Sequence, residues 1–161
     1  MTSEERARKI ELYGDAYTVL VDALERFPQE MWRFRDSHGC WSIHEHIVHI
    51  TDSGANSYVR CRRFIAEPGE SLAGYDENQW AVALDYHNQE TEEALELFKS
   101  LRLKSYTLIK SLPEKVWSNT AYHPEDGEMS LDEWLDVYER HIPEHIQYMQ
   151  ENYDAWVGEG A

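Results

Sequence analysis

Positive charge is scarce in this 161-residue sequence. Only 15 Lys and Arg residues stand against 31 Asp and Glu residues, which gives a formal net charge of −16. A chain this acidic, without a cluster of basic residues, is repelled by phosphate backbones, so nucleic acid is not expected as a partner. The acidic residues are expected to coat the solvent-facing surfaces of helices.

Long apolar runs and cysteines are also few. No apolar run approaches the roughly 20 residues that a membrane-spanning helix requires, so no membrane association is expected. The N-terminus, Met-Thr-Ser-Glu-Glu-Arg, is charged and lacks the apolar core of a secretory signal. Without such a signal, the two cysteines, Cys40 and Cys61, are expected to be reduced thiols. We therefore expect a cytoplasmic protein with a single domain over residues 1–161.

Apolar residues repeat at spacings of three and four in four long segments, and this periodicity predicts helices. The first stripe covers residues 10–27 and is expected to end at Pro28. The second helix is expected to begin after Ser42, an N-cap whose capping box is completed by Glu45. It is expected to end at residues 68–69, a Pro-Gly pair.

A connection of about fifteen residues follows, which is long for neighbouring antiparallel helices and predicts a crossover over one end of a bundle. The third stripe covers residues 84–112 and includes His87. The fourth begins at a second capping box, Ser130 with Glu133, and its stripe covers residues 131–149.

The loop between the last two stripes, residues 117–127, is rich in turn-forming residues, and no β-hairpin signal stands out. The sequence therefore predicts an all-α fold. It is a four-helix bundle with a long crossover connection between the second and third helices.

Two histidines of the last stripe, His141 and His145, are four residues apart. This spacing places both imidazoles on one helix face about one turn apart, as in other helical His-x-x-x-His metal sites. Such pairs also arise by chance on amphipathic helices, so ordinary core histidines are the alternative. Pro143 lies between them and predicts either a local distortion of the helix or a helix that begins there.

The second helix carries three histidines that could supply a third ligand. Relative to the isoleucines of its apolar stripe, His46 flanks the core direction, His49 lies further round and His44 points elsewhere. Periodicity slightly favours His46 but does not choose between His46 and His49. Asp52, three residues after His49, is a candidate acceptor that orients an imidazole, or else a solvent-facing or capping residue. All three histidines are alternatively boundary residues bonded to carboxylates or solvent.

Four segments that span most of the chain occur in an order typical of one family. They are Trp41-Ser-Ile-His-Glu-His-Ile-Val-His49-Ile-Thr-Asp52-Ser53, Tyr75-Asp-Glu-Asn-Gln-Trp80-Ala81, Leu112-Pro-Glu-Lys-Val-Trp117 with His123-Pro-Glu-Asp-Gly127-Glu-Met-Ser130, and His141-Ile-Pro-Glu-His145-Ile. The chain resembles the DinB-like superfamily of metal-binding four-helix bundles. It is most similar to the branch that contains bacillithiol transferases and metal-dependent hydrolases.

The resemblance implies that the metal ligands are His49, His141 and His145, because the family's histidine eight residues after the tryptophan corresponds to His49. It also implies a homodimer and a low-molecular-weight thiol that binds the metal as thiolate and attacks an electrophile. The leading hypothesis is a metal-dependent thiol S-transferase. The alternatives are a metal-dependent hydrolase and a non-enzymatic metal-binding stress-response module.

Three neutral imidazoles leave the metal its full charge and keep coordination positions open for water or a thiol, whose pKa the metal lowers. Zinc and nickel both suit imidazole ligands. The chain departs from this branch beside the last ligand pair, where the branch often has further histidine and tryptophan residues, so the substrate class does not carry over. His87 is a weak candidate for a further ligand, and the resemblance places His123 near the entrance. No residue is assigned as general base.

Overall fold

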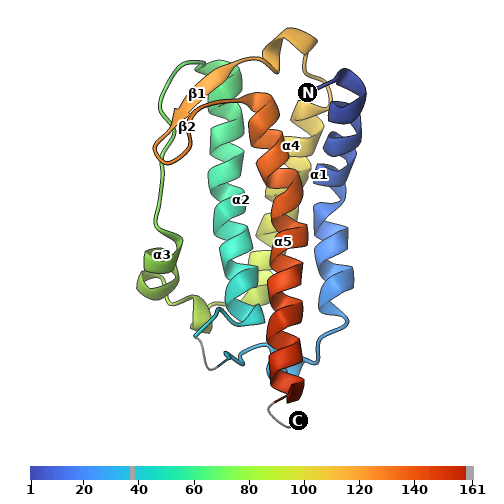
Figure 1. Ribbon diagram of the computed structural model, residues 1–161, viewed down its shortest axis with the longest axis vertical. Coiled ribbons are helices and arrows are strands. Elements are labelled where there is room, and N and C mark those ends of the chain that lie inside the picture. Colours follow the sequence, from blue (N-terminus) through green and yellow to red (C-terminus); the bar gives the residue numbers. More distant parts are fainter. Residues whose placement is uncertain (37–38, 159–161) are drawn as a thin grey trace.

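Four long helices form the body of the molecule in a computed structural model that describes residues 1–36 and 39–158 (Figure 1). They are α1 (Ser3–Leu24), α2 (Ile43–Ala66), α4 (Thr91–Ile109) and α5 (Leu131–Gly158). Helix α2 packs against α4 and α5, and α1 packs against the same two helices from the other side. The predicted four-helix bundle with a long crossover between its second and third long helices is confirmed.

Both predicted capping boxes are present and fix where α2 and α5 begin. The Ser42 hydroxyl accepts a hydrogen bond from the Glu45 amide at 3.2 Å, and the Glu45 carboxylate accepts one from the Ser42 amide at 2.9 Å. Ser130 and Glu133 repeat the pattern at 3.3 and 2.6 Å. Each box satisfies amide groups that the first helical turn leaves without partners. The box at Ser42 therefore sets the register of the helix that carries His49.

The crossover contains a short helix, α3 (Glu77–Ala83), and a 3-10 turn over Tyr86–Asn88. The prediction that the third long helix starts at Leu84 is wrong, because α4 starts at Thr91. Between the two helices Asp85 has a left-handed backbone (φ 51°), which ends helical geometry, and Tyr86 turns inward and is fully buried. The apolar stripe therefore belongs to two separate elements.

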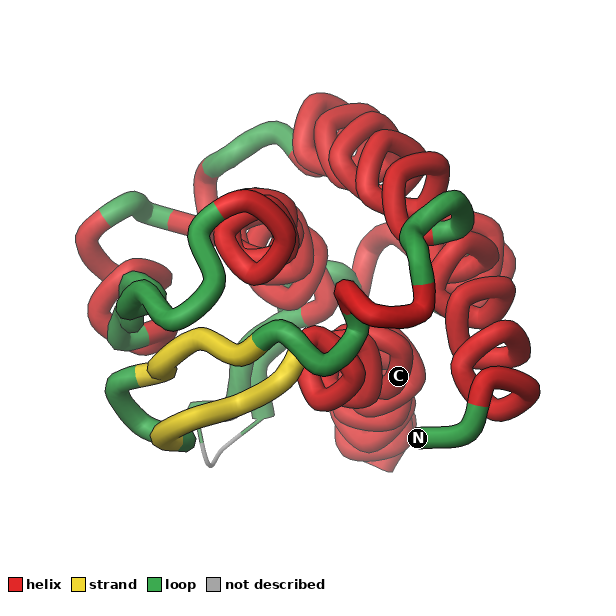
Figure 2. Tube along the Cα trace, turned by 90° about the horizontal axis from the view of Figure 1, so that it is seen from above, coloured by secondary structure: helices red, strands yellow, loops and turns green. Residues whose placement is uncertain are grey.

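The segment after α4 folds into a hairpin, although no hairpin signal stands out in its sequence. Strands β1 (Thr120–His123) and β2 (Gly127–Ser130) pair antiparallel, and Gly127 takes a positive φ of 79° at the turn. The crossover runs beside β1, where the Leu72 amide donates to the Tyr122 carbonyl at 2.8 Å. Figure 2 shows the hairpin to one side of the helices. Its backbone hydrogen bonds anchor the start of the crossover.

Helix α5 runs through Pro143 without ending, so a helix that begins at Pro143 is excluded. The proline has no amide hydrogen, so the Glu139 carbonyl loses its usual helical partner. Continuity across Pro143 keeps His141 and His145 on one helix face.

Within the two described ranges, no helix combines the length and the apolar character that crossing a membrane would need.

Candidate metal centre

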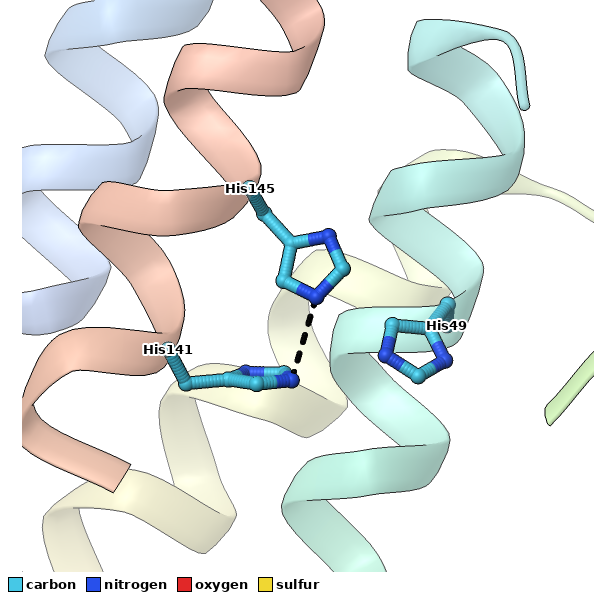
Figure 3. A group of neighbouring side chains, drawn as sticks. All are labelled: His49, His141 and His145. Carbon is cyan, nitrogen blue, oxygen red and sulfur yellow. Dashed lines mark hydrogen bonds between the residues drawn. The ribbon is translucent and has the colours of Figure 1, made fainter. Parts of the chain in front are cut away.

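Three histidines from two helices converge inside the bundle (Figure 3). His141 and His145 project from α5 toward His49 on α2, and one nitrogen of each ring lies within 4.8 Å of the other two. The Nε2 atoms of His141 and His145 are 3.1 Å apart. Metal–nitrogen bonds of about 2.0–2.1 Å place two ligand nitrogens of one ion roughly 3 Å apart, so this spacing fits a shared ion. The structure thus brings together the three residues predicted as ligands.

Burial keeps these imidazoles neutral, which is the form that binds metal. His49 is fully buried and His145 is 8% exposed. Burial lowers the pKa of His145 to about 4, and burial, followed by the proximity of the His145 ring, lowers the pKa of His49 to about 3. Burial, followed by the proximity of His145, also lowers the pKa of His141 well below its ordinary value. All three rings are therefore uncharged at neutral pH, and each has one nitrogen without a hydrogen that can bind a metal.

His49 distinguishes a ligand set from a group of ordinary core histidines. Neither of its ring nitrogens has a hydrogen-bond partner, although both are buried. The nearest carboxylate oxygen, Oε1 of Glu77, is 3.9 Å from its Nε2, beyond hydrogen-bond distance. A buried polar group without a partner costs about 1–3 kcal/mol, so a core histidine is normally paired. The donor set fits a transition metal, which would satisfy one of the two unpartnered nitrogens of His49.

His46, the other candidate on α2, lies outside the three-histidine cluster, behind the ring of His145. Its Nδ1 is 2.9 Å from Nδ1 of His145, on the opposite edge of that ring from the nitrogen that faces His141. His46 is 6% exposed, and burial lowers its pKa to about 3. Of the two residues that periodicity could not separate, His49 faces the pair on α5 directly and His46 contacts only the back of His145.

The remaining candidate residues lie outside the centre. Asp52 accepts a hydrogen bond from the Tyr86 hydroxyl at 2.7 Å rather than from an imidazole. His87 lies in the 3-10 turn of the crossover, where its ring is 6.2 Å from that of His44. His123 is in β1, and its Nδ1 is 3.0 Å from a carboxylate oxygen of Asp126 in the hairpin turn. In the part of the chain that the structure describes, none of the three belongs to the histidine cluster.

A pocket of about 380 Å³ reaches the centre beside His145. Its lining includes the carboxylates of Asp36, Glu77 and Glu151, and no Lys or Arg is among the described residues that line it. Burial raises the pKa of Glu77, and the negative charge of Glu125 raises it further. Glu77 was not predicted from the sequence, and its one signal was its position in the crossover segment that resembles the family. A small molecule in this pocket meets the rings of His46 and His145 together with negative charge.

The overall similarity to known proteins agrees with this geometry. The family model described as the DinB superfamily matches residues 13–149. The chain belongs to this superfamily. The prediction of the family from four short segments is thereby confirmed, and with it the fold that the resemblance implied.

Relatives of this DinB superfamily member carry names that refer to a metal. A protein of Oceanobacillus iheyensis named "Putative metal-dependent hydrolase" is 31% identical over 69% of this chain, and the match spans 64% of that protein. YfiT of Bacillus subtilis, which carries the same name, is 24% identical over 94% of this chain and 85% of its own length.

Solved structures show the same fold. The structure of YfiT, described as a probable metal-dependent hydrolase with an unusual four-helix bundle topology, superposes with a TM-score of 0.87 at 23% identity, over 94% of this chain and 87% of that one. A mycothiol-dependent maleylpyruvate isomerase superposes with a TM-score of 0.69 at 12% identity, over 91% of this chain and 60% of that one. At these identities the likeness concerns the fold alone.

Proposed function

We propose that this protein is a metal-dependent thiol S-transferase. In this proposal His49, His141 and His145 hold a divalent transition metal, zinc or nickel, at the inner end of the pocket. The single observation that carries the proposal is His49, a buried and neutral imidazole with two unpartnered nitrogens that faces a histidine pair on another helix. Such an arrangement costs stability unless a ligand occupies it.

The proposed reaction joins a thiol to an electrophile in the pocket. When bound, the metal lowers the pKa of a low-molecular-weight thiol so that it reacts as thiolate. The thiolate sulfur forms a bond to an electrophilic carbon in the pocket, the leaving group departs with its bonding electrons, and the thiol proton goes to solvent. Buried, neutral imidazoles add no charge of their own, so the full charge of the ion acts on the thiol. Trp41, whose ring lies 4.8 Å from that of His49, covers the centre from the pocket side.

A hydrolase is the second candidate, and one carboxylate favours it. Glu77 lies in the pocket wall with Oε1 3.9 Å from Nε2 of His49. Its raised pKa brings the carboxylate closer to the value that suits a general base at neutral pH. In a hydrolase, Glu77 would take a proton from the attacking water. The names of the relatives support this reading as much as they support a metal.

Metal analysis tests the shared part of both candidates. Protein purified without a His-tag is expected to contain stoichiometric zinc or nickel, and His49→Ala is expected to lose it because the site falls to two imidazoles. His87→Ala is the matched control, since His87 lies in the crossover outside the cluster. A wild-type protein that binds neither ion, or equal metal content in all three proteins, would overturn the proposal.

Activity then separates the two candidates. We expect metal-dependent conjugation of a thiol to monochlorobimane, which chelators abolish. Inactivity of the metal-loaded protein with bacillithiol, mycothiol, glutathione, coenzyme A and cysteine would count against thiol transfer. Turnover of ester or amide substrates without any thiol, with a large loss in Glu77→Gln, would instead establish the hydrolase.

A further inference from the structure

One ring of the histidine cluster is held from behind by a fourth histidine. Nδ1 of His46 lies 2.9 Å from Nδ1 of His145, and the two rings meet edge to face, with centroids 5.0 Å apart and planes at 64°. Both side chains are more than nine-tenths buried. A contact this short between two neutral rings is a hydrogen bond in which one nitrogen donates and the other accepts.

The surroundings decide which ring donates. Nε2 of His145 faces Nε2 of His141 and is the nitrogen that would bind the ion, so it must be free of hydrogen. A neutral imidazole carries one ring hydrogen, which in His145 is then on Nδ1 and points at His46. Nδ1 of His46 is therefore the acceptor, and its own hydrogen is on Nε2. The opposite assignment would place the His145 hydrogen on the nitrogen needed for the metal.

His46 is itself fixed by aromatic neighbours. Its ring stacks on Tyr148 with an interplanar angle of 20° and a centroid distance of 6.0 Å, and it meets Trp41 edge-on at 5.6 Å. His46 precedes His49 by three residues on α2, so the two rings lie on adjacent parts of one helix face. Helix α2 thus presents one ring to the centre and another to the ring of His145 on α5.

We propose that His46 is a positioning residue that holds His145 in the tautomer and orientation required to bind the metal. The inference rests on the proposed function, since it needs the ion. Metal-binding histidines usually donate their other ring nitrogen to a carboxylate, a carbonyl or water. Here the acceptor is an uncharged imidazole, which fixes the ring without adding negative charge beside the ion.

Metal affinity tests this role without reference to catalysis. His46→Val removes the acceptor and keeps an apolar side chain against Trp41 and Tyr148, so we expect Zn²⁺ to bind about 10–100-fold more weakly in competition with a chromogenic chelator. His46→Asn keeps an acceptor oxygen close to the Nδ1 position and is expected to bind Zn²⁺ nearly as tightly as the wild type. His44→Val is the control, because His44 is equally buried on α2 but bonds to the Gln89 carbonyl.

The visible absorption spectrum of the Co²⁺-loaded protein adds a readout that general loss of packing does not move. We expect a changed ligand-field spectrum in His46→Val and the wild-type spectrum in His46→Asn and His44→Val. Unchanged affinity and spectrum in His46→Val would overturn the inference, as would equal losses in His46→Val and His46→Asn. Failure of the wild-type protein to bind either Zn²⁺ or Ni²⁺ would instead overturn the proposed function, so the two failures are distinguishable.

Discussion

At the scale of single residues, the two cysteines show how burial sets reactivity. Cys61 is completely buried on α2, and burial raises the pKa of its thiol to about 12, so it has almost no thiolate at neutral pH. Cys40 is exposed and lies in the wall of the pocket beside Trp41. Cys61 is thus a small buried apolar residue of the core rather than a nucleophile.

The two thiols are therefore expected to react in two stages. A disulfide reagent such as DTNB should modify Cys40 in the folded protein and Cys61 only after denaturation. Cys40→Ser should leave no thiol that reacts in the native state, while Cys61→Ser should leave the native reaction unchanged. Rapid modification of both thiols without denaturant would contradict the buried position of Cys61.

Residue-level prediction succeeded where chemistry depends on spacing along one helix. The i,i+4 relation of His141 and His145 follows from helix geometry alone and placed both rings on one face. The partner on α2 did not follow from periodicity, because His46 and His49 differ by less than one helical turn. Their roles diverge only where α5 packs against α2, a contact between residues about a hundred positions apart that no local pattern encodes.

At the scale of elements, the start of α2 depends on one buried carboxylate. Glu45 is 2% exposed and accepts hydrogen bonds from the Ser42 amide and hydroxyl, both at 2.9 Å, and from Nε of Arg35 at 2.8 Å. Burial alone would raise the pKa of Glu45, but the Arg35 guanidinium and the Ser42 hydrogen bonds outweigh it and lower the pKa. The charged form is therefore the one that stabilises the helix.

Glu45→Gln is expected to lower the free energy of unfolding by about 1–3 kcal/mol at neutral pH, because it removes the negative charge that pairs with Arg35 and replaces one buried acceptor oxygen with a donor. Since the pKa is lower in the folded state, this stabilisation is present above the unfolded-state value of 4.5 and is lost as the pH falls through the folded-state pKa. The free energy of unfolding, measured in urea, should therefore decline less toward acid pH in the variant than in the wild type.

Glu133→Gln offers the matched control, because Glu133 completes the capping box of α5 but is exposed. Glu133→Gln should lower the free energy of unfolding clearly less than Glu45→Gln does at neutral pH. Equal losses in the two variants would show that the cap matters and the burial does not.

The elements that were predicted correctly are those with local signals. The long helices follow from apolar periodicity and capping boxes, which involve residues three or four positions apart. The start of α4 and the hairpin were missed because each depends on distant contacts. Tyr86 leaves the helical pattern to pack against Trp41, with ring centroids 6.5 Å apart, and β1 is held by the crossover chain beside it.

At the scale of the whole molecule, negative charge is expected to select substrates. The chain has a formal charge of −16, and the described pocket wall carries three carboxylates without Lys or Arg. Cationic or neutral thiols should therefore react with higher kcat/KM than anionic ones, with cysteamine ahead of glutathione. Added salt should narrow the difference because it screens exposed charges.

Glu151→Gln should raise kcat/KM for glutathione more than for cysteamine, since Glu151 lines the pocket. Glu4→Gln makes the same change in net charge in the first turn of α1, at the end of the bundle away from the start of α2 (Figure 1), and should leave the preference unchanged. A preference for glutathione at low salt would contradict the electrostatic argument.

The convergence of His49 with His141 and His145 also bears on the lifetime of the folded chain. The ligands come from its first and last thirds and meet only when α2 and α5 are packed, so an unfolded chain offers no comparable site. An ion held there acts as a removable cross-link, worth about 4 kcal/mol when free metal exceeds its dissociation constant a thousandfold. The supply of metal would then govern the abundance of the protein as well as its activity, because chains deprived of the ion open more often and are degraded sooner.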